Sequence, residues 1–126
     1  MAIREVMREY LDKITATDFE GAMEHYTDDV VAHATGVGPG SGVFEGKAAF
    51  GGYLARMTEM MDSMQIREHD LLTSDDHAVV LNTMELTRGD KTFTTNRVVI
   101  YHFEGDKISE LWMVDADQHG AAEFMA

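Results

Sequence analysis

Three polar side chains of this 126-residue chain are candidates for acid–base chemistry: His33, Asn96 and Asp115. Asp115 lies in the apolar run "LWMVDAD", where a carboxyl group sheltered from water suits proton transfer near neutral pH. His33 ends the run "VVAH", and histidine is the side chain that exchanges a proton in the physiological range. Asn96 could hold a carboxylate or a substrate carbonyl. Plainer readings remain open: a hydrogen-bonded strand histidine, and an aspartate that reaches water at a strand end.

Other chemistries have weaker support in the sequence. The chain has no cysteine and no G-x-S-x-G motif, so a covalent nucleophile is not indicated. The glycine-rich stretch 36–46 matches neither the P-loop nor the dinucleotide pattern, and it is interpreted as a flexible lip after the His33 strand. No two histidines have the H-x-x-x-H spacing of a metal site. His77 and His102 would face each other across two strands, but we expect neither a metal ion nor a cofactor.

The elements that position these residues follow from hydrophobic periodicity. Residues 3–14 have helical spacing, residues 19–26 form a second helix after a capping box at 17–20, and residues 50–64 form the apolar face of a third. The methionines of that face, among them Met57, suit either core packing or an adaptable pocket. "VVAHAT" is expected to be a short strand, and strands dominate from residue 64 onward.

Two Gly-Asp turns, at 89–90 and 105–106, predict a three-stranded meander. Counting outward from these turns pairs Leu81 with Val98, Val98 with Met113, and Asn96 with Asp115. Cross-strand partners share a sheet face, so these five residues are expected to lie on one face and line a pocket. A one-residue bulge would move every assignment beyond it to the other face.

The opposite face, which would carry Asn82 and Arg97 beside Tyr101, Phe103 and Trp112, is also substantially apolar. Three helices can cover only one side of a sheet, so a second copy of the chain is the simplest cover for the other. The sequence therefore predicts a homodimer through an outer face that contains Tyr101 and Trp112.

Composition narrows the class of protein. The length suits one domain, and 23 acidic against ten basic residues give a formal net charge of −13. This charge disfavours nucleic acid and anionic membranes as partners. No apolar run has the length of a membrane span, and the charged N-terminal segment is unlike a secretory signal, so a cytoplasmic protein is expected.

The order of four local patterns resembles the nuclear transport factor 2-like superfamily. These are "YTDDVVAH", "GVFEGKAAF", "VIYHFEGDKISELW" and "DADQHGAAEFMA". Together they are most similar to its SnoaL-type, polyketide-cyclase-like branch, which is related to the ketosteroid isomerases. The resemblance implies an α+β fold over residues 1–126, with a cone-shaped curved antiparallel sheet wrapped around three N-terminal helices. This is the cystatin-like roll, with a cavity inside the cone.

The resemblance also implies site residues. Tyr10, Tyr26 and Tyr53 match pocket tyrosines of the ketosteroid isomerases, whose hydroxyls can donate to a developing oxyanion. The two carboxylates of that family are absent, since one position falls at Ala34, or at His33 if one residue is gapped, and the other at Val99. The expected site therefore comprises a catalytic set and a ligand-binding set: His33, Asp115 and Tyr10 for the first, and Tyr26, Tyr53, Met57, Asn96, Val98 and Met113 for the second.

Three functions are compatible with this site. One is cofactor-free acid–base isomerisation, cyclisation or hydration of a small apolar carbonyl compound. Another is non-catalytic binding of a small apolar molecule, and the last is a dimerisation module whose cavity is filled by its own side chains.

Overall fold

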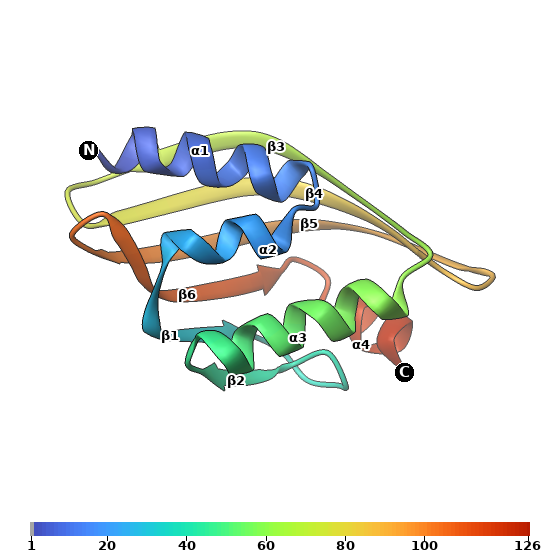
Figure 1. Ribbon diagram of the computed structural model, residues 1–126. Coiled ribbons are helices and arrows are strands. Elements are labelled where there is room, and N and C mark those ends of the chain that lie inside the picture. Colours follow the sequence, from blue (N-terminus) through green and yellow to red (C-terminus); the bar gives the residue numbers. More distant parts are fainter. Residues whose placement is uncertain (1) are drawn as a thin grey trace.

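Strands from most of the chain join in one curved sheet. The computed structural model describes residues 2–126, and Figure 1 shows the sheet with helices along one side. The strand order is β2-β1-β6-β5-β4-β3, and neighbours are antiparallel except β1 and β6, which are parallel. The sheet does not close. The strands are β1 (Tyr26–Ala34), β2 (Gly42–Glu45), β3 (Ser63–Thr73), β4 (His77–Arg88), β5 (Lys91–Glu104) and β6 (Lys107–Asp115).

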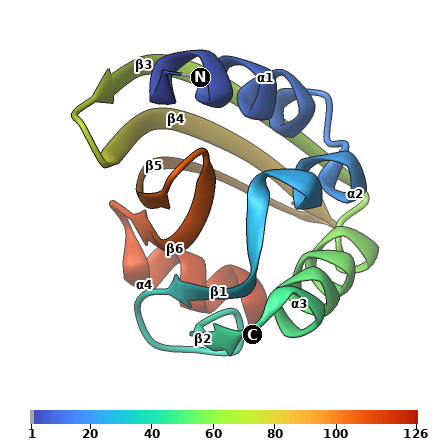
Figure 2. The same ribbon diagram turned by 60° about the vertical axis from the view of Figure 1, so that its left-hand side comes forward.

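The helices fill the inside of the curve. The three expected N-terminal helices are present, and α1 packs on β3 and β4 whereas α3 packs on β1 and β2 (Figure 2). The last helix, α4, packs on β5 and β6 near the glycine-rich loop and has no counterpart among the expected helices. The helices are α1 (Ile3–Thr15), α2 (Phe19–Ala22), α3 (Lys47–Met60) and α4 (Gln118–Met125), with a 3₁₀ turn at Met23–His25.

Two of the expected helix ends are wrong by four residues. The second helix ends at Ala22, a 3₁₀ turn follows at Met23–His25, and Tyr26 begins β1. The third ends at Met60, so Met64 belongs to β3 and not to the helical face. The cap of α2 is Asp18, whose carboxylate accepts a hydrogen bond from the Gly21 N–H at 2.9 Å.

The β4–β5 hairpin has the expected register, with Leu81 opposite Val98 and Thr83 opposite Asn96. Both hairpin turns place their glycine, Gly89 or Gly105, at φ +62°, the left-handed region that these turns require.

The β5–β6 hairpin contains a bulge that overturns the expected face assignments. Phe103 pairs with Ile108 as expected, but His102 pairs with Glu110, so Ser109 is the extra residue. Beyond the bulge, Met113 pairs with Val99 and not with Val98. Asp115 likewise pairs with Arg97 and not with Asn96. A single added residue inverts every side chain that follows it in a strand.

The inner face is the one that carries Tyr101, which is only 4% exposed and belongs to the main core. The expectation that Tyr101 lies on the outer face is therefore wrong. Trp112 does lie there, half-buried, because the bulge moves it to the side of Val98 and Ile100. Three of the four large apolar side chains that are most exposed share this outer face: Val43, Leu72 and Leu81.

Candidate functional site

An apolar cavity lies between the inner sheet face, the helices and the glycine-rich loop. Its volume is about 160 Å³, close to the roughly 150 Å³ of an apolar cavity that accommodates benzene. The wall is mostly aliphatic, methionine and aromatic. The side chains that line it include Tyr10, Tyr26, Phe50, Tyr53, Leu54, Met57, Met84, Phe93, Val99, Tyr101, Leu111, Met113 and Phe124.

A row of polar side chains crosses the floor of this cavity. Asn82 pairs with Arg97, and Arg97 pairs with Asp115, so the three lie side by side on β4, β5 and β6. Val80, Val99 and Met113 form the next row on the same face. A charged pair and an amide are thus placed in an apolar surrounding, where electrostatic interactions are stronger than in water.

Asp115 is held by two neighbours on β5. Its Oδ1 lies 3.3 Å from Arg97 Nε and accepts a hydrogen bond from Thr95 Oγ1 at 3.1 Å. Both contacts use Oδ1, and within residues 2–126 Oδ2 has no hydrogen-bond partner. The carboxylate is therefore fixed in orientation with one oxygen free to accept a proton.

Two buried polar atoms in the row lack a protein partner within the described residues. Asn82 Oδ1 makes no hydrogen bond although Asn82 is only 7% exposed. Arg97 Nε is also without one, because its contact with Asp115 is an ion pair and not an aligned hydrogen bond. Arg97 Nη1 contacts only the sulfur of Met84, at 2.7 Å. Buried polar atoms are rarely left without partners, so this row can satisfy polar groups of a bound molecule.

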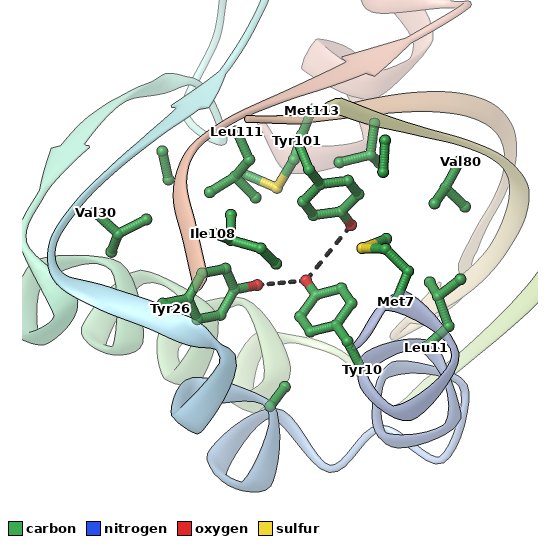
Figure 3. Close-up of a cluster of buried hydrophobic side chains, with 14 of the residues drawn as sticks. Met7, Tyr10, Leu11, Tyr26, Val30, Val80, Tyr101, Ile108, Leu111 and Met113 are labelled. Atoms are coloured by element: carbon green, nitrogen blue, oxygen red, sulfur yellow. Dashed lines mark hydrogen bonds between the residues drawn. The ribbon is translucent and has the colours of Figure 1, made fainter. Parts of the chain in front are cut away.

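Three tyrosines form a second polar cluster, which Figure 3 shows inside the core. The Tyr10 and Tyr26 hydroxyls are hydrogen-bonded to each other, and the Tyr101 hydroxyl donates to that of Tyr10 at 3.4 Å. Burial raises the pKa of all three phenols well above the usual value, so they stay protonated at neutral pH. Three O–H groups make two bonds among themselves, which leaves one proton to donate to a ligand oxygen.

The tyrosine cluster and the polar row occupy different parts of the cavity. Tyr101 and Arg97 point to the same side of β5 but are four residues apart, roughly 13 Å of strand. The Tyr53 hydroxyl donates to the carbonyl oxygen of Gly40 in the glycine-rich loop at 3.0 Å, and the charges of Arg97 and Asp115 act on its phenol. Burial raises the pKa of Tyr53 as well.

The cavity brings together six of the nine residues expected from the sequence. These are Tyr10, Tyr26, Tyr53, Met57, Met113 and Asp115. The remaining three, His33, Asn96 and Val98, do not line it. Asn96 and Val98 lie on the outer face. The bulge at Ser109 pairs Asp115 with Arg97 and Met113 with Val99, so these two β5 residues share the inner face with them.

His33 belongs to the outer face with them. It pairs with Trp112 across the parallel β1–β6 ladder, and the two rings stack with centroids 5.2 Å apart. His33 Nε2 lies 2.7 Å from a carboxylate oxygen of Glu110. His33 and Asp115 are therefore on opposite sides of the sheet, and they cannot act together on one molecule. The plainer reading of His33, a strand histidine held by hydrogen bonding, is the one observed.

Sequence reasoning missed Arg97, Asn82 and Thr95 as cavity residues. Arg97 and Asn82 were expected on the outer face, with Tyr101 and Trp112. The signal that could have found them is an arginine within "TNRVVIYHF", since a charged residue in a long apolar strand needs a partner when it is buried.

The glycine-rich loop borders the cavity next to α4. Thr35, Val37, Gly40 and Ser41 line its mouth. A Cβ on Gly38, which has φ +113°, would lie 2.9 Å from that of Ala122 in α4. The glycine at this position therefore allows the loop and α4 to meet closely, and together they form one wall of the cavity.

The chain belongs to the family described as the SnoaL-like domain, whose model matches residues 7–111. None of the curated proteins matches the sequence. Within residues 2–126, the helices are too short or too polar to cross a membrane.

Solved structures with the same fold cover nearly the whole chain. A cystatin-like protein of unknown function from Xanthomonas campestris is 24% identical, with a TM-score of 0.92 over 100% of this chain and 99% of that one. TerC, co-crystallised with polyporic acid, is 19% identical, with a TM-score of 0.84 over 98% and 97%. A protein with a ketosteroid isomerase-like fold from Catenulispora acidiphila, in complex with trimethylamine, is 12% identical, with a TM-score of 0.78 over 97% and 94%. These similarities establish the fold, which is α+β and nuclear transport factor 2-like.

Proposed function

We propose that the cavity binds a small, largely apolar molecule that carries an oxygen function, and that Asp115 transfers a proton on it without a cofactor. The observation that carries the proposal is the polar row Asn82–Arg97–Asp115 in an otherwise apolar cavity, with buried polar atoms left unsatisfied. A protein interior normally satisfies such atoms, so the natural partners are a ligand oxygen that accepts from Arg97 Nε and a ligand hydroxyl that donates to Asn82 Oδ1.

The chemistry that fits is proton transfer next to a carbonyl group. The free Oδ2 of Asp115 would take a proton from the carbon beside the carbonyl. The electron pair of the C–H bond would then move toward the carbonyl oxygen and form an enolate. If the ligand has a C=C bond in the β,γ position, the enolate is a dienolate, and returning the proton from Asp115 to its γ carbon would complete an isomerisation. Arg97 would stabilise the negative charge while it resides on the ligand.

The tyrosine cluster would hold a second, distant oxygen of the same molecule. Tyr10 is the candidate for this role because it is bonded to both Tyr26 and Tyr101, and the cluster has one proton to spare. Tyr53, Met57 and Met113 would contact the apolar body between the two polar ends. A structural neighbour, TerC, was crystallised with polyporic acid, which supports the idea that a cone of this fold accepts a small organic molecule.

Hydrogen–deuterium exchange on a simple ketone tests the proposal without knowledge of the natural substrate. Phenylacetone has one ring, which matches the cavity volume, and an activated CH₂ group beside its carbonyl. The protein should accelerate loss of the CH₂ signal in the ¹H NMR spectrum in D₂O. Asp115→Asn, which keeps the shape of the side chain, should reduce the acceleration at least 100-fold.

Asp106→Asn is the matched control, because Asp106 is exposed in the β5–β6 turn and the variant loses the same charge. It should exchange like the wild type. Equal rates for both variants and the wild type would exclude Asp115 as the base. No binding of phenylacetone by the wild type, measured by NMR line broadening, would contradict the ligand class.

A second candidate function, binding without catalysis, has a specific observation in its favour. Oδ1 of Asp115 already accepts a hydrogen bond from Thr95 and forms an ion pair with Arg97. These contacts suit a carboxylate that orients an arginine for ligand binding and does not transfer protons. In that case phenylacetone would bind, exchange would stay at the background rate, and Arg97→Met would weaken binding.

We further infer that two copies of the chain associate through the outer sheet face. A row of apolar and aromatic side chains runs across all six strands of this face: Leu72, Val79, Ile100, Trp112, His33 and Val43. Exposed apolar side chains that lie together, as in this row, are typical of protein–protein interfaces.

A further inference from the structure

A cluster of metal-binding side chains lies outside the cavity, where the β3–β4 turn meets β5. His77 begins β4, and His102 faces it directly on β5, as the Gly-Asp turn at 89–90 predicts. His77 Nε2 and His102 Nδ1 are 3.2 Å apart. Asp76 Oδ1 lies 2.8 Å from His77 Nδ1 on the other side of the same ring. The ligand atoms of these three residues lie within 4.8 Å of one another.

We propose that His77 and His102 bind one divalent transition-metal ion of the zinc, nickel and copper class, with Asp76 as the carboxylate that orients His77. Imidazole nitrogen is a preferred ligand of these ions, and a neighbouring carboxylate is a common companion. The site is independent of the cavity, because His77 and His102 lie on the outer face, and the proposal does not depend on the proposed function.

The distance between the two ring nitrogens fits a shared ion. Two nitrogens bound to zinc at 2.0–2.1 Å in a tetrahedral arrangement are roughly 3.3–3.4 Å apart. The 3.2 Å between His77 Nε2 and His102 Nδ1 is close to this value. Both atoms can therefore bind the same ion with small rotations of the rings, and without movement of the strands.

Asp76 prepares His77 for this role. An ionised carboxylate only accepts hydrogen bonds, so the proton of the neutral His77 ring resides on Nδ1 and is donated to Asp76. The lone pair of the ring is then on Nε2, the atom that faces His102. This arrangement of carboxylate, histidine and metal is typical of protein metal sites, and it orients the ring and raises its basicity as a ligand.

The surrounding backbone holds the three residues in place. The Phe103 N–H donates to the carbonyl oxygen of Asp76 at 2.8 Å, which ties the turn to β5 beside His102. The His77 N–H donates to Ser74 Oγ at 3.1 Å. The site is also open to solvent, since the side chain of His77 is 44% exposed, so an ion and the waters that complete its coordination can enter. The net charge of −13 favours cations at the surface.

Isothermal titration with ZnCl₂ tests the proposal on the full chain. The wild type should bind one Zn²⁺ per chain with micromolar affinity. His77→Gln and His102→Gln should each abolish this binding event, and Asp76→Asn should weaken it by about 10–100-fold. His119→Gln is the matched control, because it also removes one of the six histidines, from an exposed position on α4. It should bind like the wild type.

A spectroscopic measurement keeps the proposal testable if a variant folds poorly. In ¹H–¹⁵N spectra of the histidine rings, Zn²⁺ should shift His77 Nε2 and His102 Nδ1 in the wild-type protein and leave the ring nitrogens of His119 unchanged. The proposal is wrong if the wild type binds no zinc. It is equally wrong if the His77, His102 and His119 variants all bind with one affinity, or if the ring signals of His77 and His102 do not respond.

Discussion

Arg97 and Asp115 are oppositely charged residues within an apolar cavity, and each affects the contribution of the other to stability. Their side chains are only 16% and 21% exposed, so both charges are largely removed from water. The attraction between the two charges offsets part of this desolvation cost. Removing one partner should therefore be more harmful than removing both.

Arg97→Met should lower the free energy of unfolding by about 2 kcal/mol, since Asp115 then keeps a poorly solvated charge without a partner. The double variant Arg97→Met, Asp115→Leu should recover most of this loss. Urea denaturation at pH 7 measures both values. If the double variant is as unstable as the sum of the two single variants, the pair does not stabilise the fold through charge compensation.

His25 supplies a pH dependence of stability. It is buried at the end of the 3₁₀ turn, and its Nε2 lies 3.1 Å from Lys13 Nζ. Burial, assisted by the charge of Lys13, lowers the pKa of His25 below its ordinary value. The unfolded chain titrates this histidine near pH 6.5, so below that pH the unfolded state binds a proton that the folded state resists. The stability from His25 is complete above about pH 6.5 and is lost as the pH falls through the lowered folded-state pKa.

His25→Gln should remove this part of the pH dependence, because glutamine can accept the Lys13 hydrogen bond without binding a proton. The measurement is the difference in unfolding free energy between wild type and variant from pH 7.5 to pH 5, which cancels the contribution of the other histidines. The difference should change by at most about 1.4 kcal/mol per pH unit in the affected window. Parallel curves for the two proteins would show that His25 has the same pKa folded and unfolded.

At the scale of elements, the Ser109 bulge in β6 decides which side chains enter the cavity. It places Leu111, Met113 and Asp115 inside and leaves Glu110 and Trp112 outside. Deleting Ser109 would remove the bulge, so that β6 pairs with β5 without an extra residue. Glu110 and Trp112 would then point into the core.

The deletion should lower the free energy of unfolding by more than about 4 kcal/mol, or prevent folding, because it buries a carboxylate and exposes core side chains. Ser109→Ala is the control, since it keeps the extra residue and removes only the bond from Ser109 Oγ to the carbonyl oxygen of His102. It should cost about 0.5–1.5 kcal/mol in the same thermal or urea unfolding measurement. A deletion variant as stable as Ser109→Ala would mean that the register is not set by the bulge.

The same bulge explains what could and could not be predicted from the sequence. Helical periodicity in residues 3–14 and the Gly-Asp turns at 89–90 and 105–106 are local signals, and the corresponding elements are where they were expected. A bulge has no comparable local signal in "DKISELW", so the predicted pairing was correct up to Phe103 and wrong beyond it. The three tyrosines expected in the cavity, Tyr10, Tyr26 and Tyr53, precede the meander and do not depend on its register, whereas Asn96 in place of Arg97 followed from the missed bulge. The short helix α4 was also missed, because its eight residues have few large apolar side chains.

At the scale of the whole molecule, the outer sheet face carries exposed apolar side chains, among them Val43, Leu72 and Leu81. The helices pack against the inner side of the curve, where α1, α3 and the inner-face side chains share one core. Leu72 and Leu81 on the outer face are 50% and 37% exposed, and Val98 lies opposite Leu81. Monomeric proteins rarely leave an apolar patch of this kind in water.

The wild type should therefore behave as a dimer, with twice the 14.1 kDa chain mass in size-exclusion chromatography with light scattering. The double variant Leu72→Glu, Leu81→Glu should shift it to the monomer mass, because like charges would face each other across a two-fold interface. Val37→Glu is the matched control: Val37 is 70% exposed but lies in the glycine-rich loop at the cavity mouth, so this variant should remain dimeric. A wild-type monomer at micromolar concentration would refute the interface. A dimer that persists in the double variant but is lost in Val37→Glu would move the interface to the cavity mouth and leave the outer face without a partner.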